Sequence, residues 1–296
     1  MSTHASAAPA GPAPVRTAAG TAPAGPAPRP ARSRIQGRQT LLRSVRAEWI
    51  KFWSLRSTWI TSFITIALTV LFGAGLTAVL GRTEEYQDTA KNLITQGLTF
   101  GQVVVAVLGA LIITGEYSSG QIRSSLAAVP KRGQLLVSKA VVLAIVSFLL
   151  GSLSVFLSWA ISKPFIGEHA GSLTDSHYIG YIWGSGLVFA VIALMALGLG
   201  FLLRSTAGTV TVIVSLLFII TAPLQLAASK WDWVFKIIGC LPSTVAEAVS
   251  DPFQRTTEWG GQGAQFLTHG QAIAVFAAWA LVPLIAAWFV FSRRDA

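Results

Sequence analysis

Charged side chains are scarce in this chain of 296 residues. Asp, Glu, Lys and Arg make up only 11% of it, and 53% of the residues are hydrophobic. Ordinary soluble domains contain about 25% charged residues. This balance excludes an ordinary soluble fold and indicates a protein that lies largely in a membrane.

Several kinds of catalytic and cofactor site are also missing. The single cysteine, Cys240, excludes an intrachain disulfide, and no spacing of Cys and His fits a zinc site. No Gly-x-x-x-x-Gly-Lys-[Ser/Thr] loop occurs, so the chain cannot hold ATP by that device. None of the four histidines is placed to activate a serine. We therefore expect no catalytic residue, no metal site and no bound cofactor in this chain.

Six apolar stretches, each long enough to cross a bilayer, run through the rest of the chain. A helix of about 20 residues spans a hydrocarbon layer of about 30 Å. Lys139 is the only charge in any stretch, and it is close enough to the start of the third to extend toward the interface. The sequence predicts an all-α membrane protein with six transmembrane helices, at about 59–80, 93–114, 135–161, 178–203, 207–229 and 271–291.

Positive charge is distributed unevenly among the segments that connect these spans. The segment before the first span holds nine Lys or Arg residues against one acid, Glu48, and the second connection is also basic. The connections on the opposite side carry a small excess of acids. Because Lys and Arg accumulate on the cytoplasmic side, we expect a multi-pass protein of the cell membrane with both termini in the cytoplasm. The basic residues lack interleaved aromatic side chains, which argues against nucleic-acid binding.

Two different segments precede the first span. Residues 1–40 are dominated by Ala, Pro and Gly, and we expect a disordered cytoplasmic tail. Residues 41–56 carry apolar side chains at helical spacing, so we expect an interfacial amphipathic helix at the start of a membrane domain, residues 41–296. A soluble amphipathic helix packed on another domain is the alternative. Lipid headgroups are expected to be contacted by Arg46, Trp49, Lys51 and Trp53.

The fifth and sixth spans are separated by a long segment, residues 230–270. Its apolar face is interrupted at Leu241-Pro242-Ser243-Thr244. An apolar segment with a proline break predicts a re-entrant or interfacial hairpin on the outer side, and a plain extracytoplasmic loop is the alternative.

Two pairs of glycines have the spacing of close helix contacts. They are Gly97-x-x-x-Gly101 and Gly180-x-x-x-Gly184. Small residues four apart let two helix backbones approach closely, so we expect these glycines to serve packing.

The most informative polar stretch is the connection between the second and third spans, residues 115–133. A protein that pressed on this cytoplasmic stretch would move both spans together. Its pattern resembles the cytoplasmic loop of ABC-2 type transporter permeases, the membrane-spanning halves of ABC exporters. The matching residues are Gly115-Glu116-x-x-x-Gly120-x-Ile122-Arg123-x-x-Leu126 and Pro130-x-Arg132.

Two further segments resemble the same family. Glu48-Trp49-x-Lys51, within residues 41–56, resembles its amphipathic elbow before the first span. Leu241-Pro242-Ser243-Thr244 resembles its outer re-entrant region. The resemblance covers residues 41–294 and leaves the tail unmatched, and Gln121 stands where Thr or Ser is more usual in the family.

The resemblance implies a permease that exports a hydrophobic or amphipathic compound. It implies that the chain forms a homodimer, or a pair with a similar permease, in membrane lipid. It also implies that this pair binds separate ABC ATP-binding proteins, which hold the ATP. Glu116 would pair with a basic group or cap a helix end, and Arg123 and Arg132 would contact acidic groups of the partner or lipid phosphate. The residues expected to couple the chain to the ATPase subunit are Glu116, Tyr117, Arg123, Pro130 and Arg132.

Two other functions remain as alternatives. An ion-driven secondary carrier needs ionisable side chains or broken helices at the middle of the bilayer, which the predicted spans lack. A non-transporting membrane scaffold or sensor needs neither. Spans of aliphatic and aromatic residues suit drugs, peptides and lipids equally, so the sequence predicts no particular substrate.

Overall fold

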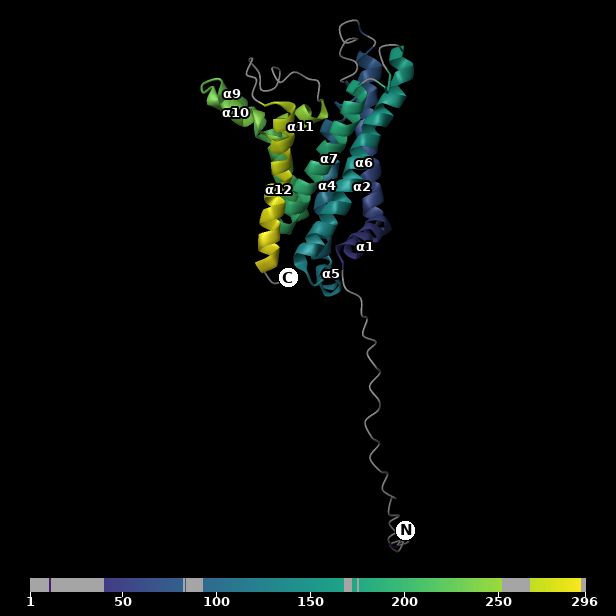
Figure 1. Cartoon of the computed structure of the whole chain (residues 1–296), viewed down its shortest axis with the longest axis vertical. Coiled ribbons are helices and arrows are strands. Elements are labelled where there is room, and N and C mark those ends of the chain that lie inside the picture. Colours follow the sequence, from purple (N-terminus) through teal and green to yellow (C-terminus); the bar gives the residue numbers. More distant parts are fainter. Residues whose placement is uncertain are drawn as a thin grey trace, which may run out of the picture. The chain divides into compact units, whose positions relative to one another are not determined.

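The computed structural model describes residues 11, 40–81, 83, 93–167, 172–174, 176–251 and 267–293. All regular secondary structure in these ranges is helical, as expected (Figure 1). The predicted disordered tail lies outside the described residues, apart from Gly11 and Thr40. Six segments are long and apolar enough to cross a membrane: α2 (Arg56–Leu80), α4 (Leu98–Ser118), α6 (Arg132–Ile166), α7 (Ser176–Leu203), the run Thr206–Ala228 and α12 (His269–Arg293).

The helix before the first span packs on the start of α6. This helix, α1, covers Leu41–Ser54, and the extended residue Leu55 separates it from α2. Phe52 lies in the core, and the side-chain amide of Gln134 in α6 donates to the Ser44 hydroxyl over 2.8 Å. The helix is therefore two residues shorter than predicted and is fixed to the bundle along one side.

The second span is shifted along the chain relative to its prediction. α4 begins at Leu98 instead of residue 93, because residues 94–97 form turns in which Gly97 packs on the backbone carbonyl of Thr69. At its other end α4 continues through Gly115–Ser118, which was predicted to belong to the connection. Glu116 consequently lies on a transmembrane helix and not on a loop.

The fifth span is not a regular helix. A π-helical turn interrupts it, and the backbone N–H of Ile220 bonds to the carbonyl of Ser215 over 2.9 Å. Such turns widen a helix locally and are often found at functional sites. The three parts of the span are α8 (Thr206–Val214), the π-helical turn η3 (Ser215–Ile219) and α9 (Thr221–Ala228).

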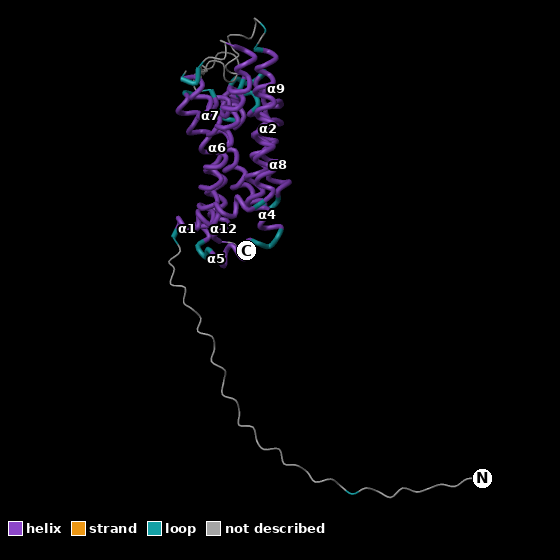
Figure 2. The backbone as a smooth tube through the Cα atoms, turned by 90° about the vertical axis from the view of Figure 1, so that its right-hand side faces the viewer, coloured by secondary structure: helices purple, strands orange, loops and turns teal. Residues whose placement is uncertain are grey.

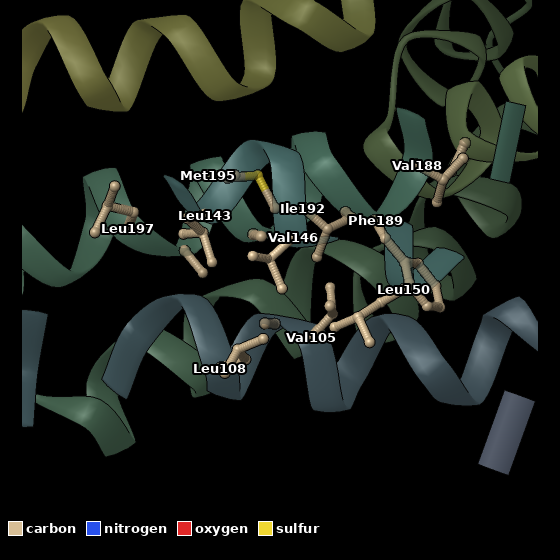
Figure 3. Packing of buried hydrophobic residues seen from close by; sticks show 14 of the residues in the cluster. Val105, Leu108, Leu143, Val146, Leu150, Val188, Phe189, Ile192, Met195 and Leu197 are labelled. Carbon is tan, nitrogen blue, oxygen red and sulfur yellow. The ribbon is translucent and has the colours of Figure 1, made fainter. Parts of the chain in front are cut away.

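α7 is the central helix of the bundle. Within its most hydrophobic window 67% of the residues are buried, against 11% for the run Thr206–Ala228. It packs against α4, α6 and α12. Figure 3 shows side chains of α4, α6 and α7 meeting in this core, among them Val105, Leu143 and Ile192. Small residues admit these close neighbours: Gly151 of α6, for example, packs on the Ser185 carbonyl of α7.

α2 turns its hydroxyl-bearing face inward and its large apolar side chains outward. Thr65, Thr69 and Thr77 are fully buried, and each hydroxyl donates to the carbonyl four residues earlier over 2.7 to 2.8 Å. Phe63 and Leu71, in contrast, are 72% and 64% exposed. Because lipid is as apolar as a protein core, small residues that pack closely occupy helix contacts in membranes. This arrangement supports the membrane assignment independently of hydropathy.

The segment between the fifth and sixth spans contains a sharp bend. α10 (Trp233–Gly239) and α11 (Pro242–Ser250) meet at 59°, with Pro242 as the first residue of α11. The bend fits either a broken span or a re-entrant hairpin, so the hairpin stays a prediction. Figures 1 and 2 show α9 at one end of the long helices and α1 and α5 (Ile122–Ala128) at the other.

Candidate functional site

Four ionisable side chains from three helices meet near α5. We call this set the charge cluster: Glu48 and Lys51 of α1, Glu116 of α4 and Lys139 of α6. One carboxylate oxygen of Glu116, Oε1, accepts hydrogen bonds from both lysine ammonium groups. Lys139 Nζ also donates to Glu48 Oε2 over 2.9 Å. Because two positive and two negative charges are present, the cluster as a whole is neutral.

Helical geometry explains how the cluster forms. Glu48 and Lys51 are three residues apart, so they lie on the same face of α1. Glu116 occupies the last turn of α4, and Lys139 lies two turns into α6. The packing of α1 and α4 along α6 brings these positions together, although they are far apart in sequence.

The cluster is buried unequally. The Lys139 side chain is 1% exposed and that of Glu116 is 4%, whereas the Lys51 side chain is 25% exposed. The second oxygen of Glu116, Oε2, is buried and has no hydrogen-bond partner among the described residues. A buried charge that loses its counter-ion is strongly destabilising, so the two deepest members depend most on each other.

α5 lies directly against this cluster. A turn connects it to α4, and there Gly120 has φ +70°, a left-handed conformation that glycine adopts without strain. Ile122 at the start of α5 is buried, and Ser125 Oγ accepts a hydrogen bond from Lys51 Nζ at 3.4 Å. A displacement of α5 would therefore act on α4, α6 and the cluster together.

The other predicted coupling residues occupy different positions. Arg123 on α5 and Pro130 after it are exposed, so both are accessible to another protein. Tyr117 is half-buried, with the Arg204 guanidinium carbon 5.0 Å from its ring centre. The structure thus places Glu116 in the interior and Arg123 and Pro130 on the surface beside it.

Arg132 contacts the last span. Its Nη1 donates to the backbone carbonyl of Phe291 over 2.9 Å, and its guanidinium carbon lies 5.8 Å from the Phe291 ring centre. A cation at the carboxyl end of a helix satisfies free carbonyls and complements the helix dipole. This contact joins the start of α6 to the end of α12.

The predicted lipid-anchoring residues of α1 also separate into two groups. Arg46 is exposed, and Trp53 is 36% exposed and lies between two other tryptophans, edge-on to Trp49 and tilted against Trp59. Its ring centre lies 5.8 Å from that of Trp49 and 4.8 Å from that of Trp59. Lys51 instead turns inward to Glu116. Lipid contact by these residues stays a prediction.

The interpretation of Lys139 as a side chain that extends toward the interface is wrong. Its ammonium group is buried and held by Glu48 and Glu116 from two other helices. Sequence reasoning also missed Glu48 as a member of the site. The available signal was the single lysine in an otherwise uncharged span, since a buried charge needs a counter-charge. No group of three or more His, Cys, Asp or Glu side chains suited to a metal occurs in the described ranges.

Comparison with known families agrees with the resemblance noted in the sequence. A family model described as "ABC-2 family transporter protein" matches residues 44–222, more than half of the chain. The chain belongs to the ABC-2 transporter family. Among curated proteins, no match to the chain is found.

The matched region of this ABC-2 transporter begins in α1 and ends in α9, so it contains the whole charge cluster and α5. Membership makes the chain a multi-pass membrane protein and the membrane domain of an ABC transporter. Such membrane subunits lack a catalytic domain, and the family implies an ATP-binding partner.

Proposed function

We propose that this chain is the permease subunit of an ATP-driven exporter of a hydrophobic or amphipathic compound. ATP is bound and hydrolysed by a separate subunit, and this chain binds no cofactor itself. The observation that carries the proposal is the charge cluster, which ties the elbow-like α1 to α4 and α6 directly beside the exposed helix α5. A site of this kind is suited to transmitting a mechanical movement between helices and not to catalysing a reaction.

In this proposal the ATP-binding subunit docks on α5 through Arg123, Pro130 and neighbouring exposed residues. Closure of that subunit on ATP displaces α5. Because Lys51 of α1 bonds to both Glu116 and Ser125, the cluster moves with α5. The neutral, tightly paired cluster keeps α1, α4 and α6 in register during the movement, and the rest of the bundle responds as packed helices do.

α4 gives the movement a direct path through the membrane. From Glu116 to Gln102 it is one uninterrupted helix, about 20 Å long at 1.5 Å per residue. A tilt imposed at the cluster is therefore transmitted to the far end, where α4 approaches α9 and α11. This helix connects the proposed energy input with the region where a transported compound would be released.

We further propose that two copies assemble, with α1, α5 and both termini in the cytoplasm. The orientation is supported by the excess of Lys and Arg in segments at the α1 and α5 end. Assembly is supported by the run Thr206–Ala228, which is apolar but only 11% buried within one chain. A second copy would cover this surface.

The coupling role is tested with an ATP-binding protein encoded beside this chain, co-expressed and reconstituted with it in proteoliposomes. We expect Arg123→Glu to reduce transport-linked ATP hydrolysis at least tenfold, because it reverses a charge at the docking surface. Arg293→Glu is the matched control: it makes the same charge change on an exposed residue of α12 at the same end, away from α5 and from the charge cluster. Transport by the chain alone would contradict the proposal. Unchanged efflux in the double variant Glu116→Ala/Arg123→Ala would favour a scaffold or sensor.

Orientation is tested separately by labelling. After Cys240→Ser removes the only cysteine, a new cysteine is placed at exposed Ser119, beside α5, or at exposed Ser229, after α9. In intact cells an impermeant maleimide should label the Ser229→Cys variant only. Labelling of only the Ser119→Cys variant would reverse the proposed orientation.

A further inference from the structure

A cavity of about 510 Å³ lies at the end of the helices opposite the charge cluster. Its wall is formed by the start of α4, by Val188 of α7, and by η3, α9, α10 and α11. Sites for drug-sized ligands usually measure about 300–1,000 Å³. We call it the α4–α11 cavity.

The polar groups in its wall lack partners within the described part of the chain. Gln102 is only 7% exposed, lines the cavity and makes no hydrogen bond through its side chain to a described residue. The hydroxyl oxygens of Thr221 and Ser243, in two other wall helices, are buried and likewise without a partner. Since buried polar groups are normally satisfied, the unpaired Gln102 amide on the cavity wall indicates a hydrogen-bonding group that a ligand could use.

Among the described residues of the wall, Glu247 on α11 is the one acidic or basic side chain. No Lys or Arg in the described ranges lies within ion-pair distance of it, and Glu247 is exposed. This contrasts with Glu116, whose charge is balanced inside the protein by two lysines. The cavity wall therefore presents a carboxyl group that no Lys or Arg of the described ranges neutralises.

Apolar side chains complete the lining. Leu217 and Phe218 of η3, Phe235 of α10 and Val188 of α7 lie on the wall together with the polar groups. A ligand that fits must therefore offer an apolar body, hydrogen-bonding groups and a positive charge. A purely aliphatic lipid would leave Gln102 and Glu247 unmatched, and an anion would be repelled.

We propose that the α4–α11 cavity binds an amphipathic organic cation, with its ammonium group at Glu247, a hydrogen-bonding group at Gln102 and its apolar body against η3 and α10. This inference deepens the proposed function and rests on it for the identification of the ligand as transported cargo. Gln102 and Glu116 lie on the same helix, so the ligand site and the charge cluster are mechanically joined.

The test is a binding measurement on the full chain alone, in phosphatidylcholine nanodiscs, without ATP or a partner subunit. The probe is dansylcadaverine, a fluorescent alkylammonium, and the reference probe is its uncharged N-acetyl derivative. Fluorescence anisotropy is read after subtraction of the signal from empty nanodiscs. The variants are Glu247→Gln, which removes the charge and keeps the shape, and Asp232→Asn, the same change at an exposed acid outside the cavity.

We expect Glu247→Gln to weaken dansylcadaverine binding at least tenfold, since a hydrogen bond to a charged group is lost. Asp232→Asn should bind as the parent does. The acetylated probe should bind weakly and equally to the parent and to Glu247→Gln, and Gln102→Leu should weaken both probes. Equal parental affinity for the two probes, or unchanged affinity after Glu247→Gln, would overturn the inference.

The two proposals fail in different ways. If the chain assembles with its ATPase but does not prefer the cationic probe, only the proposal of a cation site is overturned. If the chain binds the cation but never couples to an ATP-binding protein, only the proposal of an ATP-driven exporter is overturned.

Discussion

Removal of the Lys139 ammonium group should be the most damaging single change in the charge cluster. Lys139→Met keeps the length of the side chain but leaves Glu48 without its bond and Glu116 with only Lys51. Breaking a fully buried ion pair costs about 3–5 kcal/mol. Because Lys51 remains on Glu116, we expect a loss near the lower limit, about 3 kcal/mol in the free energy of unfolding.

Because Lys51 is more exposed than Lys139, we expect its removal to lower the free energy of unfolding by less. The Lys51 side chain is 25% exposed, so solvent screens the charge left on Glu116, and Lys51→Met should cost about 1 kcal/mol. The double variant Lys139→Met/Glu116→Gln keeps one carboxylate and one ammonium group. Its cluster is again neutral, and the double variant should therefore be less destabilised than the sum of the two single variants.

The assay is unfolding in mixed micelles, followed by tryptophan fluorescence and helical circular dichroism. Lys236→Met is the control, since this lysine is exposed on α10 at the opposite end. The reasoning is refuted if Lys139→Met costs no more than Lys236→Met, or if the double variant shows simple additivity.

Three further predictions concern backbone contacts at the site and in the core, all measured by the same unfolding assay unless stated. Gly109→Ala should destabilise the bundle by about 2 kcal/mol, because a Cβ would collide with a backbone carbonyl of α7, whereas Gly75→Ala, with open space around it, should be neutral or slightly stabilising; equal effects would contradict this packing. Gly120→Ala should cost about 1 kcal/mol because Gly120 has a positive φ, whereas Gly115→Ala should not, since Gly115 is helical and equally uncrowded. No loss of stability in Gly120→Ala would contradict the left-handed conformation of this residue. Arg132→Met should accelerate amide hydrogen exchange in the last turn of α12, since the bond to its end carbonyl is lost, and unchanged exchange would show that this contact does not hold the helix.

Helix positions were largely predictable, because hydropathy and helical spacing act over neighbouring residues. The six apolar segments correspond to the six candidate spans, with differences at their ends. Those differences have tertiary causes. α4 begins late because Gly97 packs on a carbonyl of α2, and this contact is not visible in the residues around Gly97 alone.

The candidate site was predictable only in part. The resemblance indicated that Glu116 matters and that it pairs with a basic group or caps a helix end, and the structure shows pairing with two lysines. Their identity could not be deduced, since Lys51 and Lys139 lie 65 and 23 residues from Glu116 along the chain. The role of these residues in coupling stays a prediction.

The α4–α11 cavity at the other end of the helices could not be predicted from the sequence either. Gln102, Thr221 and Glu247 belong to three helices, and nothing in their local sequence separates them from ordinary interfacial polar residues. Only the bend at Pro242 and the packing of α9 and α11 near the start of α4 bring them around one space.

The sequence alone determined that this protein lies in a membrane and that it is helical, since composition and periodicity suffice for both. Its resemblance to ABC-2 permeases rested on the motifs of residues 115–132 and of two shorter segments. The sequence also indicated where charge is absent. The tertiary structure decided how the few remaining ionisable groups are used: Lys139 and Glu116 neutralise one another inside the bundle, while Glu247 lies beside a cavity with no Lys or Arg of the described ranges at ion-pair distance. The physical reason is that a charge near lipid needs a counter-charge or water, and only the folding of distant helices determines which one it meets.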